Sequence, residues 1–271
     1  MQHFKRWITA LILAPTVIWI IVKGSTTLLA ALVCIIAIFS IREYLRIIFG
    51  KGNGPISTTI KWISYVVSGA LIAAASFGSW QVLFLIFAMN LMALSIFVLS
   101  RFASNHAIFD TIAKQVLGII YIPVPLSLLI FIKELAGGTL WVLWLLIVIF
   151  ANDTGAFYTG TFFGHKKLSP SISPNKTIEG SIGGAVVSIL AGFIFCQLFF
   201  TDFSLSLKIM PAAFMLAIAG QIGDLFESAM KRASKVKDSG RILPGHGGML
   251  DRIDGLLLAV PVLYAYLVFI L

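Results

Sequence analysis

The sequence predicts an all-α, polytopic membrane protein with about nine transmembrane helices. Of its 271 residues, 59% are hydrophobic and 11% are charged, whereas a soluble domain carries about 25% charged residues. Several uninterrupted apolar runs reach about 18 residues or more, which is long enough to cross a bilayer core of about 30 Å. We expect a single membrane domain, residues 1–271, in which helices within 1–135 form a scaffold and 136–271 carry the functional site.

The apolar runs define the helices in chain order. The first run follows Lys5 and Arg6 without a small-residue cleavage site, so we expect a retained helix rather than a signal peptide. Pro123 and Pro125 predict a kink in the fifth helix. The expected spans are roughly 7–22, 26–48, 60–77, 80–100, 112–132, 139–158, 180–200, 209–230 and 253–271.

The distribution of positive charge predicts the topology. If the N-terminus is cytoplasmic, 17 of the 20 lysines and arginines flank the cytoplasmic side of these spans, and only Lys23, Lys133 and Lys208 lie outside. The C-terminus is then on the outer side. The two longest polar loops, 159–179 and 231–252, are cytoplasmic, so we expect a protein of the cell (inner, cytoplasmic) membrane whose site faces the cytoplasm. The net charge of +9 flanks spans and therefore does not indicate a nucleic-acid partner.

Cysteine and histidine usage restricts the metal chemistry. Cys34 and Cys196 each lie inside an apolar run, which suits buried helix positions rather than a disulfide framework. The four histidines have no zinc-ligand spacing. A metal bound here should be a hard cation held by carboxylate oxygens.

Three acidic residues on separate spans lie at a similar depth. With a helical rise of 1.5 Å per residue, Asp153 and Asp224 lie roughly 21 and 22 Å from the outer ends of their spans, and Asp254 lies roughly 26 Å from the C-terminal end of the last. All three are therefore expected just below the cytoplasmic boundary, where an ionisable residue marks a functional site.

Further acids are spaced to join this group. Glu227 lies three residues after Asp224, and Asp251 three before Asp254, so each pair can share a helical face. A divalent cation would relieve their mutual repulsion. The alternative is a set of buried salt bridges with Arg232, Arg252 and Lys237.

The two long loops supply cations and small polar groups. Cations beside carboxylates at a membrane surface suit an anionic, metal-bound substrate such as a nucleoside triphosphate. In the first loop Ser173, Asn175 and Thr177 surround Lys176 ahead of a helix start, where free N–H groups favour phosphate. The alternative makes Ser173 a helix cap and Lys176 a snorkelling cation.

Glycines mark two close approaches. His246, Gly247 and Gly248 allow backbone to approach a ligand, with His246 as a donor; a tight turn into the last helix is the alternative. The G-x-x-x-G spacing of Gly180 and Gly184 predicts close helix packing.

Residues 228–254, S-A-M-K-R-A-S-K-V-K-D-S-G-R-I-L-P-G-H-G-G-M-L-D-R-I-D, resemble the signature of the phosphatidate cytidylyltransferase (CDP-diacylglycerol synthase) family. Residues 152–180 are similar to the second typical region of that family. The resemblance implies a magnesium-dependent nucleotidyltransferase of phospholipid biosynthesis that converts CTP and phosphatidic acid into CDP-diacylglycerol and pyrophosphate. It also implies that Asp224, Asp251 and Asp254 lie near metal, and Lys176, Lys237 and Arg252 near phosphates.

These inferences assign roles to individual residues. The catalytic residues are expected to be Asp224, Asp251, Lys176 and Lys237. Asp224 and Asp251 should bind Mg²⁺, and Asp254 could help to hold a second cation. The expected substrate-binding residues are Ser173, Asn175, Lys176, Thr177, Lys231, Arg232, Lys237, Arg241, His246, Gly247, Gly248 and Arg252.

Other functions stay open at this point. A CTP-dependent lipid-alcohol kinase would attack the γ-phosphate and release CDP. A secondary transporter of an anionic solute would also place charges within spans, although it would show inverted repeats and broken midplane helices. A CDP-alcohol phosphotransferase would need the pattern D-G-x-x-A-R, which is absent. Partners besides CTP and phosphatidic acid are membrane lipids, and a homodimer is left open.

Overall fold

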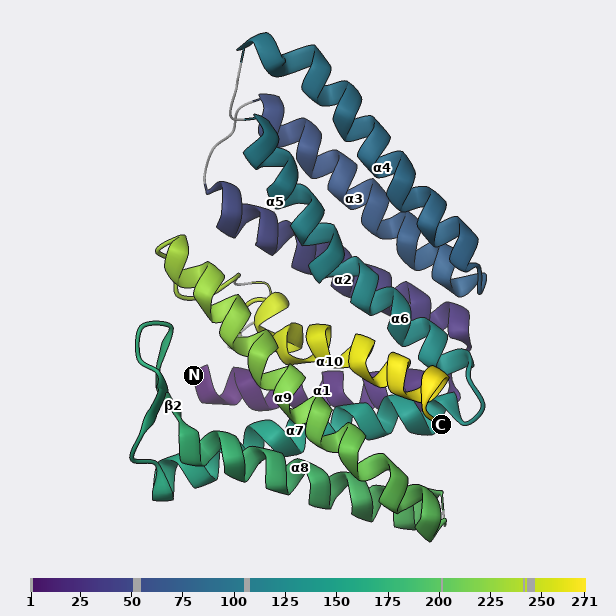
Figure 1. Ribbon diagram of the computed structural model, residues 1–271, viewed down its shortest axis with the longest axis vertical. Coiled ribbons are helices and arrows are strands. Elements are labelled where there is room, and N and C mark those ends of the chain that lie inside the picture. The colour runs from purple at the N-terminus through teal and green to yellow at the C-terminus, as the bar shows by residue number, and fades with distance from the viewer. Residues whose placement is uncertain (1, 51–54, 105–107, 201, 241, 243–246) are drawn as a thin grey trace. The chain divides into compact units, whose positions relative to one another are not determined.

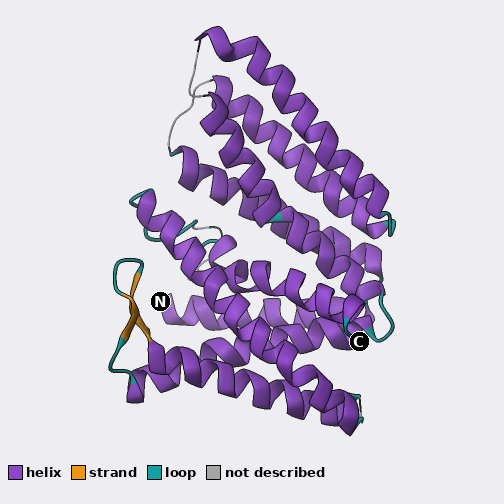
Figure 2. Ribbon diagram, in the orientation of Figure 1, coloured by secondary structure: helices purple, strands orange, loops and turns teal. Residues whose placement is uncertain are grey.

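The computed structural model describes residues 2–50, 55–104, 108–200, 202–240, 242 and 247–271. Helices account for most of the described chain, with one short pair of strands (Figures 1 and 2). The chain forms two compact units, one made of residues 1–131 and 238–250 and the other of residues 132–237 and 251–271. Residues 238–250 belong to the first unit, and the expected single membrane domain stays a prediction.

The first unit contains the N-terminal helices. They are α1 (Gln2–Lys23), α2 (Thr26–Phe49), α3 (Pro55–Ser76), α4 (Trp80–Arg101), the single 3₁₀ turn η1 (Phe102–Ser104), α5 (Ile108–Tyr121) and the first part of α6 (Pro123–Glu134). Helices suit a bilayer because each backbone N–H and C=O is satisfied within its own segment. Serine side chains cap two of them: Ser25 accepts from Leu28 N, and Ser79 from Val82 N.

Helices α2, α3, α4 and α5 pack together, and polar contacts tie them at specific points. Tyr44 on α2 is fully buried and donates its hydroxyl to the Lys114 carbonyl of α5 at 2.8 Å. Its ring lies against Gly118, where a Cβ would come within 2.5 Å. Asn90 of α4 and Gln115 of α5 exchange two side-chain hydrogen bonds. Buried amides of this kind fix the register between apolar helices.

The fifth span is interrupted at Ile122, close to the predicted kink, although helical hydrogen bonds from Ile122 N to the Gly118 carbonyl and from Leu126 N to the Ile122 carbonyl bridge this position. Helix α5 ends at Tyr121 and α6 begins at Pro123, because proline cannot donate a backbone hydrogen bond but fits the first turn of a new helix.

The second unit contains α7 (Gly138–Phe163), strands β1 (Lys167–Ser169) and β2 (Ser173–Thr177), α8 (Ile178–Phe199), α9 (Phe203–Ala233) and, apart from Leu250, α10 (Leu250–Phe269). The strands form an antiparallel hairpin in which Lys167 faces Thr177. This hairpin, drawn in orange in Figure 2, was not expected from the sequence.

Helices α7 and α8 pack closely through small residues. A Cβ on Gly184 would lie 2.7 Å from the Asn152 carbonyl oxygen, and one on Gly180 would lie 2.8 Å from that of Ala156. Trp144 Nε1 donates to the Gly192 carbonyl further along the same interface, at 3.0 Å. The packing predicted from the G-x-x-x-G spacing is therefore confirmed.

Within the described residues, eight helical segments are long and apolar enough to cross a membrane, counting Ile108–Glu134 as one. They correspond to the second to ninth expected spans. Helix α1 contributes the shorter apolar stretch Leu13–Lys23, and its role as a ninth span stays a prediction. The chain is an all-α polytopic membrane protein. Cys34 and Cys196 both lie in helices as free thiols; Cys196 is buried as expected, whereas Cys34 is partly exposed.

Candidate functional site

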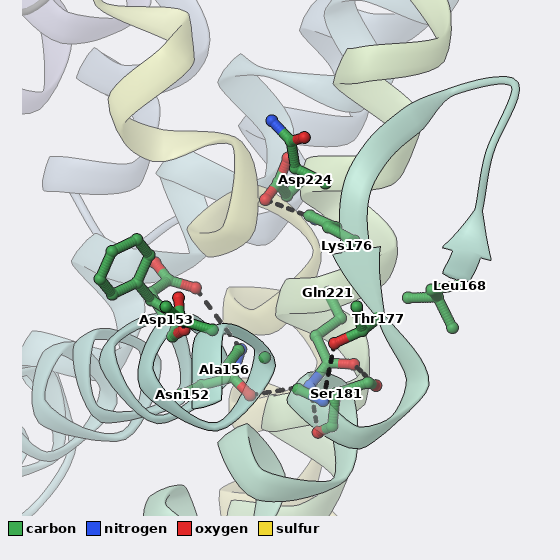
Figure 3. Close-up of a pocket in the computed structure, with 14 residues that line it drawn as sticks. Asn152, Asp153, Ala156, Leu168, Lys176, Thr177, Ser181, Gln221 and Asp224 are labelled. Carbon is green, nitrogen blue, oxygen red and sulfur yellow. Dashed lines mark hydrogen bonds and ion pairs between the residues drawn. The ribbon is translucent and has the colours of Figure 1, made fainter. Parts of the chain in front are cut away.

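The second unit contains a cavity of about 530 Å³ between α7, the hairpin, α8 and α9 (Figure 3). This volume is in the range of small-molecule sites, about 300–1,000 Å³. Apolar groups line most of it, and its polar side chains come from all four elements. These polar residues are Asn152, Asp153, Thr161, Asn175, Lys176, Thr177, Ser181, Gln221 and Asp224.

The hairpin is held in place at its base, where it joins α8. Thr177 is the N-cap of α8, and its Oγ1 accepts from Gly180 N at 3.1 Å. Glu179 accepts the backbone N–H groups of His165 and Lys166 at 3.1 and 3.2 Å. Ser173 begins β2, so the alternative that Ser173 caps the helix is wrong. The hairpin thereby presents Lys176 to the cavity from a fixed base.

Lys176 and Asp224 form an ion pair across the cavity wall. Lys176 Nζ lies 2.5 Å from Asp224 Oδ2, joining the hairpin to α9 (Figure 3). The two side chains are 26% and 38% exposed, so both remain accessible from the cavity. A ligand can therefore engage the cation and the carboxylate together.

Gln221 of α9, below this pair in Figure 3, forms hydrogen bonds with α7 and α8. Its Nε2 donates to Asn152 Oδ1 of α7 at 2.9 Å and to the Ser181 carbonyl of α8 at 3.0 Å. Ser181 Oγ donates back to Gln221 Oε1. Gln221, Asn152 and Ser181 were not among the site residues predicted from the sequence. The sequence signal for Gln221 was its polar side chain inside an apolar run, three positions before Asp224.

The acids that the depth estimate placed at one level do come together. Asp153, Asp224 and Asp254, from α7, α9 and α10, interact electrostatically with one another. Helices α9 and α10 are in close contact here, since a Cβ on Gly223 would overlap the Asp254 carbonyl oxygen. Asp254 Oδ1 accepts from Gly255 N at 2.8 Å. The carboxylates of Asp153, Asp224 and Asp254 thus converge near Lys176, and Lys231 also acts on Asp254.

Lys231 joins two further acids. Its Nζ lies 2.8 Å from Asp251 Oδ1 and also contacts Glu227 one turn earlier on α9. The Glu227 side chain is fully buried, and those of Lys231 and Asp251 are 14% exposed. The alternative to a metal site was a set of salt bridges with Arg232, Arg252 and Lys237, but the described ion pairs of these acids use Lys176 and Lys231.

The remaining predicted residues have varied positions. Asn175 lines the cavity and is exposed. Arg232, Lys237 and Arg252 are exposed at the surface and are not among the residues that line the cavity. Arg232 Nε donates to the Ile172 carbonyl of the hairpin loop at 3.2 Å. Arg241 and His246 lie outside the described residues. Gly247, with φ 84°, and the buried Gly248 belong to the first unit.

No three histidine, cysteine or carboxylate side chains are arranged to hold a metal ion within the part of the chain that the structure describes. Mg²⁺, however, is commonly bound by one or two carboxylates together with substrate phosphates and water rather than by an all-protein cage. The carboxylates of Asp153, Asp224 and Asp254 are hard oxygen ligands that repel one another, which is the donor chemistry that such a cation requires.

Comparison with known proteins places the chain in a family. The sequence profile described as "Cytidylyltransferase family" matches residues 4–270. The phosphatidate cytidylyltransferase of Staphylococcus haemolyticus is 36% identical over 276 residues, covering 97% of this chain and 98% of the relative. That of Staphylococcus aureus (strain COL) is 35% identical over 269 residues, with the same coverage. The chain therefore belongs to the cytidylyltransferase family.

Proposed function

From this membership we propose that the protein transfers the cytidylyl group of CTP to phosphatidic acid, giving CDP-diacylglycerol and pyrophosphate. The observation that carries the proposal is the similarity to phosphatidate cytidylyltransferases along 97% of the chain. The cavity supports it, because a lysine and converging carboxylates in a membrane protein suit a reaction between a nucleotide and a lipid phosphate.

The reaction needs charge neutralisation more than proton transfer. A phosphate monoester is mostly ionised at neutral pH, its second pKa being about 6. A phosphatidate oxygen can therefore attack the α-phosphorus of CTP without a general base. A bond forms from that oxygen to the α-phosphorus, and the bond from the α-phosphorus to the bridging oxygen breaks, which releases pyrophosphate. The main obstacle is the approach of two anions.

The residues of the cavity can lower this obstacle. Lys176 would exchange Asp224 for phosphate oxygens when CTP binds, and its fixed hairpin base holds the ammonium in position for this. Lys237 and Arg252, both exposed, would contribute further positive charge to the triphosphate. Asn175 and Thr177 offer polar groups beside Lys176.

We propose that Mg²⁺ binds to Asp224 with Asp251, and that Asp254 helps to hold a second cation. When bound, such a cation would polarise the phosphates and stabilise the charge that develops on pyrophosphate. Lys231 now neutralises Asp251 and Glu227, so Asp251 would have to exchange this partner on binding. Asp153, which shares the electrostatic environment of Asp224 and Asp254, is a further candidate ligand.

Lipid access follows from the helices that line the cavity. Phe157 of α7 is 67% exposed and borders the cavity, as do Gly160 and Thr161. In a bilayer this wall would face acyl chains, and the hairpin would lie at the level of the lipid headgroups. The positive-inside distribution of lysine and arginine supports a site that faces the cytoplasm.

The decisive experiment uses purified protein in detergent with cytidine-labelled CTP, phosphatidic acid and Mg²⁺. We expect cytidine label in the lipid phase and release of pyrophosphate, loss of both with excess EDTA, and recovery on addition of Mg²⁺. In a parallel assay with a lipid alcohol in place of phosphatidic acid, release of CDP with a phosphorylated lipid would instead identify a kinase. Neither product from either lipid would contradict the proposed function.

A further inference from the structure

Glu43 is a buried carboxylate of the first unit that the proposed reaction does not use. It lies on α2, far from any predicted site residue in sequence, and is only 3% exposed. Its Oε2 accepts two hydrogen bonds, from Ser239 Oγ and from Leu250 N, both at 2.9 Å. These partners are 196 and 207 residues away along the chain. A buried carboxylate with such distant partners fixes the positions of the segments that it joins.

A second residue of α2 strengthens the same connection. Arg46, one turn after Glu43, donates from its guanidinium to the Ser239 carbonyl at 2.8 Å. Ser239 therefore contacts α2 through both its hydroxyl and its backbone. We name Glu43, Arg46, Ser239 and Leu250 the Glu43 clamp.

Two glycines of the segment 238–250 leave room for this carboxylate. A Cβ on Gly240 would overlap Glu43 Oε1 and come within 2.5 Å of Cδ, and its three nearest atoms all belong to Glu43. A Cβ on Gly248 would lie 2.5 Å from Glu43 Oε2 and overlap Ser239 Oγ. Among the described residues, Glu43 therefore explains why glycine occupies both positions, since a larger side chain at either would collide with the clamp atoms around it.

The clamp also acts on the beginning of a helix. Leu250 is the first residue of α10, and its N–H is one of the groups that an α-helix cannot satisfy internally. A carboxylate acceptor there is favoured by the partial positive charge of a helix N-terminus. Glu43 therefore provides, from a different helix, the acceptor that a capping side chain usually provides locally.

We infer that Glu43 is a positioning residue for cytidylyl transfer, an inference that rests on the proposed function. The clamp holds both ends of the segment 238–250. In the sequence these ends continue directly into Lys237 and Asp251, which we propose to bind triphosphate and metal. Fixing the ends pre-organises those two residues, so loss of the clamp should weaken CTP binding more than lipid binding.

The first measurement is independent of activity. Hydrogen exchange of the purified chain in detergent should show the Leu250 amide protected in the unsubstituted protein, and Glu43→Ala should increase its exchange rate about 10-fold or more. The exposed Asp110→Asn, in the same unit, is the matched control and should leave this rate unchanged. An unchanged Leu250 exchange rate in folded Glu43→Ala would overturn the inference.

The second measurement separates positioning from general stability. Glu43→Ala should raise the KM for CTP by about 10- to 100-fold, with less than a threefold change in the KM for phosphatidic acid. Equal changes in both KM values would indicate a structural role only. Failure of the unsubstituted protein to make CDP-diacylglycerol would instead contradict the proposed function, and the exchange experiment would still test the clamp.

Two further variants keep the inference testable if Glu43→Ala does not fold. Ser239→Ala removes one hydrogen-bond donor to Glu43 and leaves α2 intact. It should therefore raise the exchange rate of the Leu250 amide and the KM for CTP, each by less than Glu43→Ala does. Gly240→Ala displaces the carboxylate and should have the same effect. Behaviour of both variants like that of the unsubstituted protein would overturn the inference.

Discussion

At Asp224, one carboxylate faces both the Lys176 ammonium and the charges of Asp153 and Asp254. Lys176 and Lys231 are the lysines in the described ion pairs here, and they serve five carboxylates, those of Asp153, Asp224, Glu227, Asp251 and Asp254, which leaves an excess of carboxylates near the cavity. This excess is the physical reason to expect that a cation arrives with the triphosphate. It also makes Asp224 the residue whose neutralisation is most informative.

Asp224→Asn keeps the size of the side chain and removes its charge. We expect cytidylyl transfer to fall by at least about 100-fold, because Asn is a poor cation ligand and an ineffective partner for Lys176. The protein should remain folded, since the side chain is 38% exposed. The measurement is turnover in detergent, alongside size-exclusion behaviour. Normal transfer by this variant would remove Asp224 from the mechanism.

Gln221 is a second residue with a testable role. Gln221→Ala leaves the polar groups of Asn152 and Ser181 without the partners described above. We expect the free energy of unfolding to fall by about 1–3 kcal/mol. Denaturant titration in mixed micelles measures this, with Gln81→Ala at the exposed start of α4 as the control. Equal stability of the two variants would contradict a structural role for Gln221.

At the scale of elements, the glycine-lined contact between α7 and α8 determines the shape of the cavity, because both helices line it. The described backbones approach so closely here that side chains at Gly180 and Gly184 have no space. The same contact brings Asn152 within reach of Gln221. Packing and site geometry therefore depend on the same few residues.

Substitution of glycine by alanine should have opposite effects on stability at a crowded and at an open position. Gly184→Ala puts a methyl group 2.7 Å from the Asn152 carbonyl oxygen and should destabilise the protein by about 1–3 kcal/mol. Gly69→Ala in α3 meets no atom within 4 Å and should be neutral or stabilise by up to about 1 kcal/mol. Thermal unfolding of the two variants checks the signs. A stable Gly184→Ala would show that α7 and α8 can separate at little cost.

Elements differed in how well the sequence predicted them. The spans and the interruption next to Pro123 follow from local hydropathy and proline chemistry, and the convergence of Asp153, Asp224 and Asp254 follows from counting residues along helices. The hairpin was missed because its strands are very short and one contains Pro174. The contacts of Glu43 and Gln221 were missed because their partners are distant in sequence, and periodicity carries no information about them.

At the scale of the whole molecule, the positive-inside distribution predicts opposite exposure for two described surface positions. In a chain without Cys34 and Cys196, a cysteine at Ser171 in the hairpin loop should react with an impermeant maleimide only from the cytoplasmic side. A cysteine at Ser204, exposed at the start of α9, should react only from the outer side. Labelling of right-side-out and inverted vesicles checks this. Labelling of both positions from one side would contradict the topology.

Helix α9 has 31 residues and is therefore about 46 Å long, which exceeds a hydrocarbon core of about 30 Å. A tilt of about 49° would be needed to immerse it fully, beyond the usual range of up to about 40°. Part of the helix must emerge into the aqueous phase, and its last turn carries Lys231 and Arg232. The length of α9 beyond the lipid tails thus lets the helix fit membranes of different thickness while Lys231 and Arg232 stay on its protruding turn.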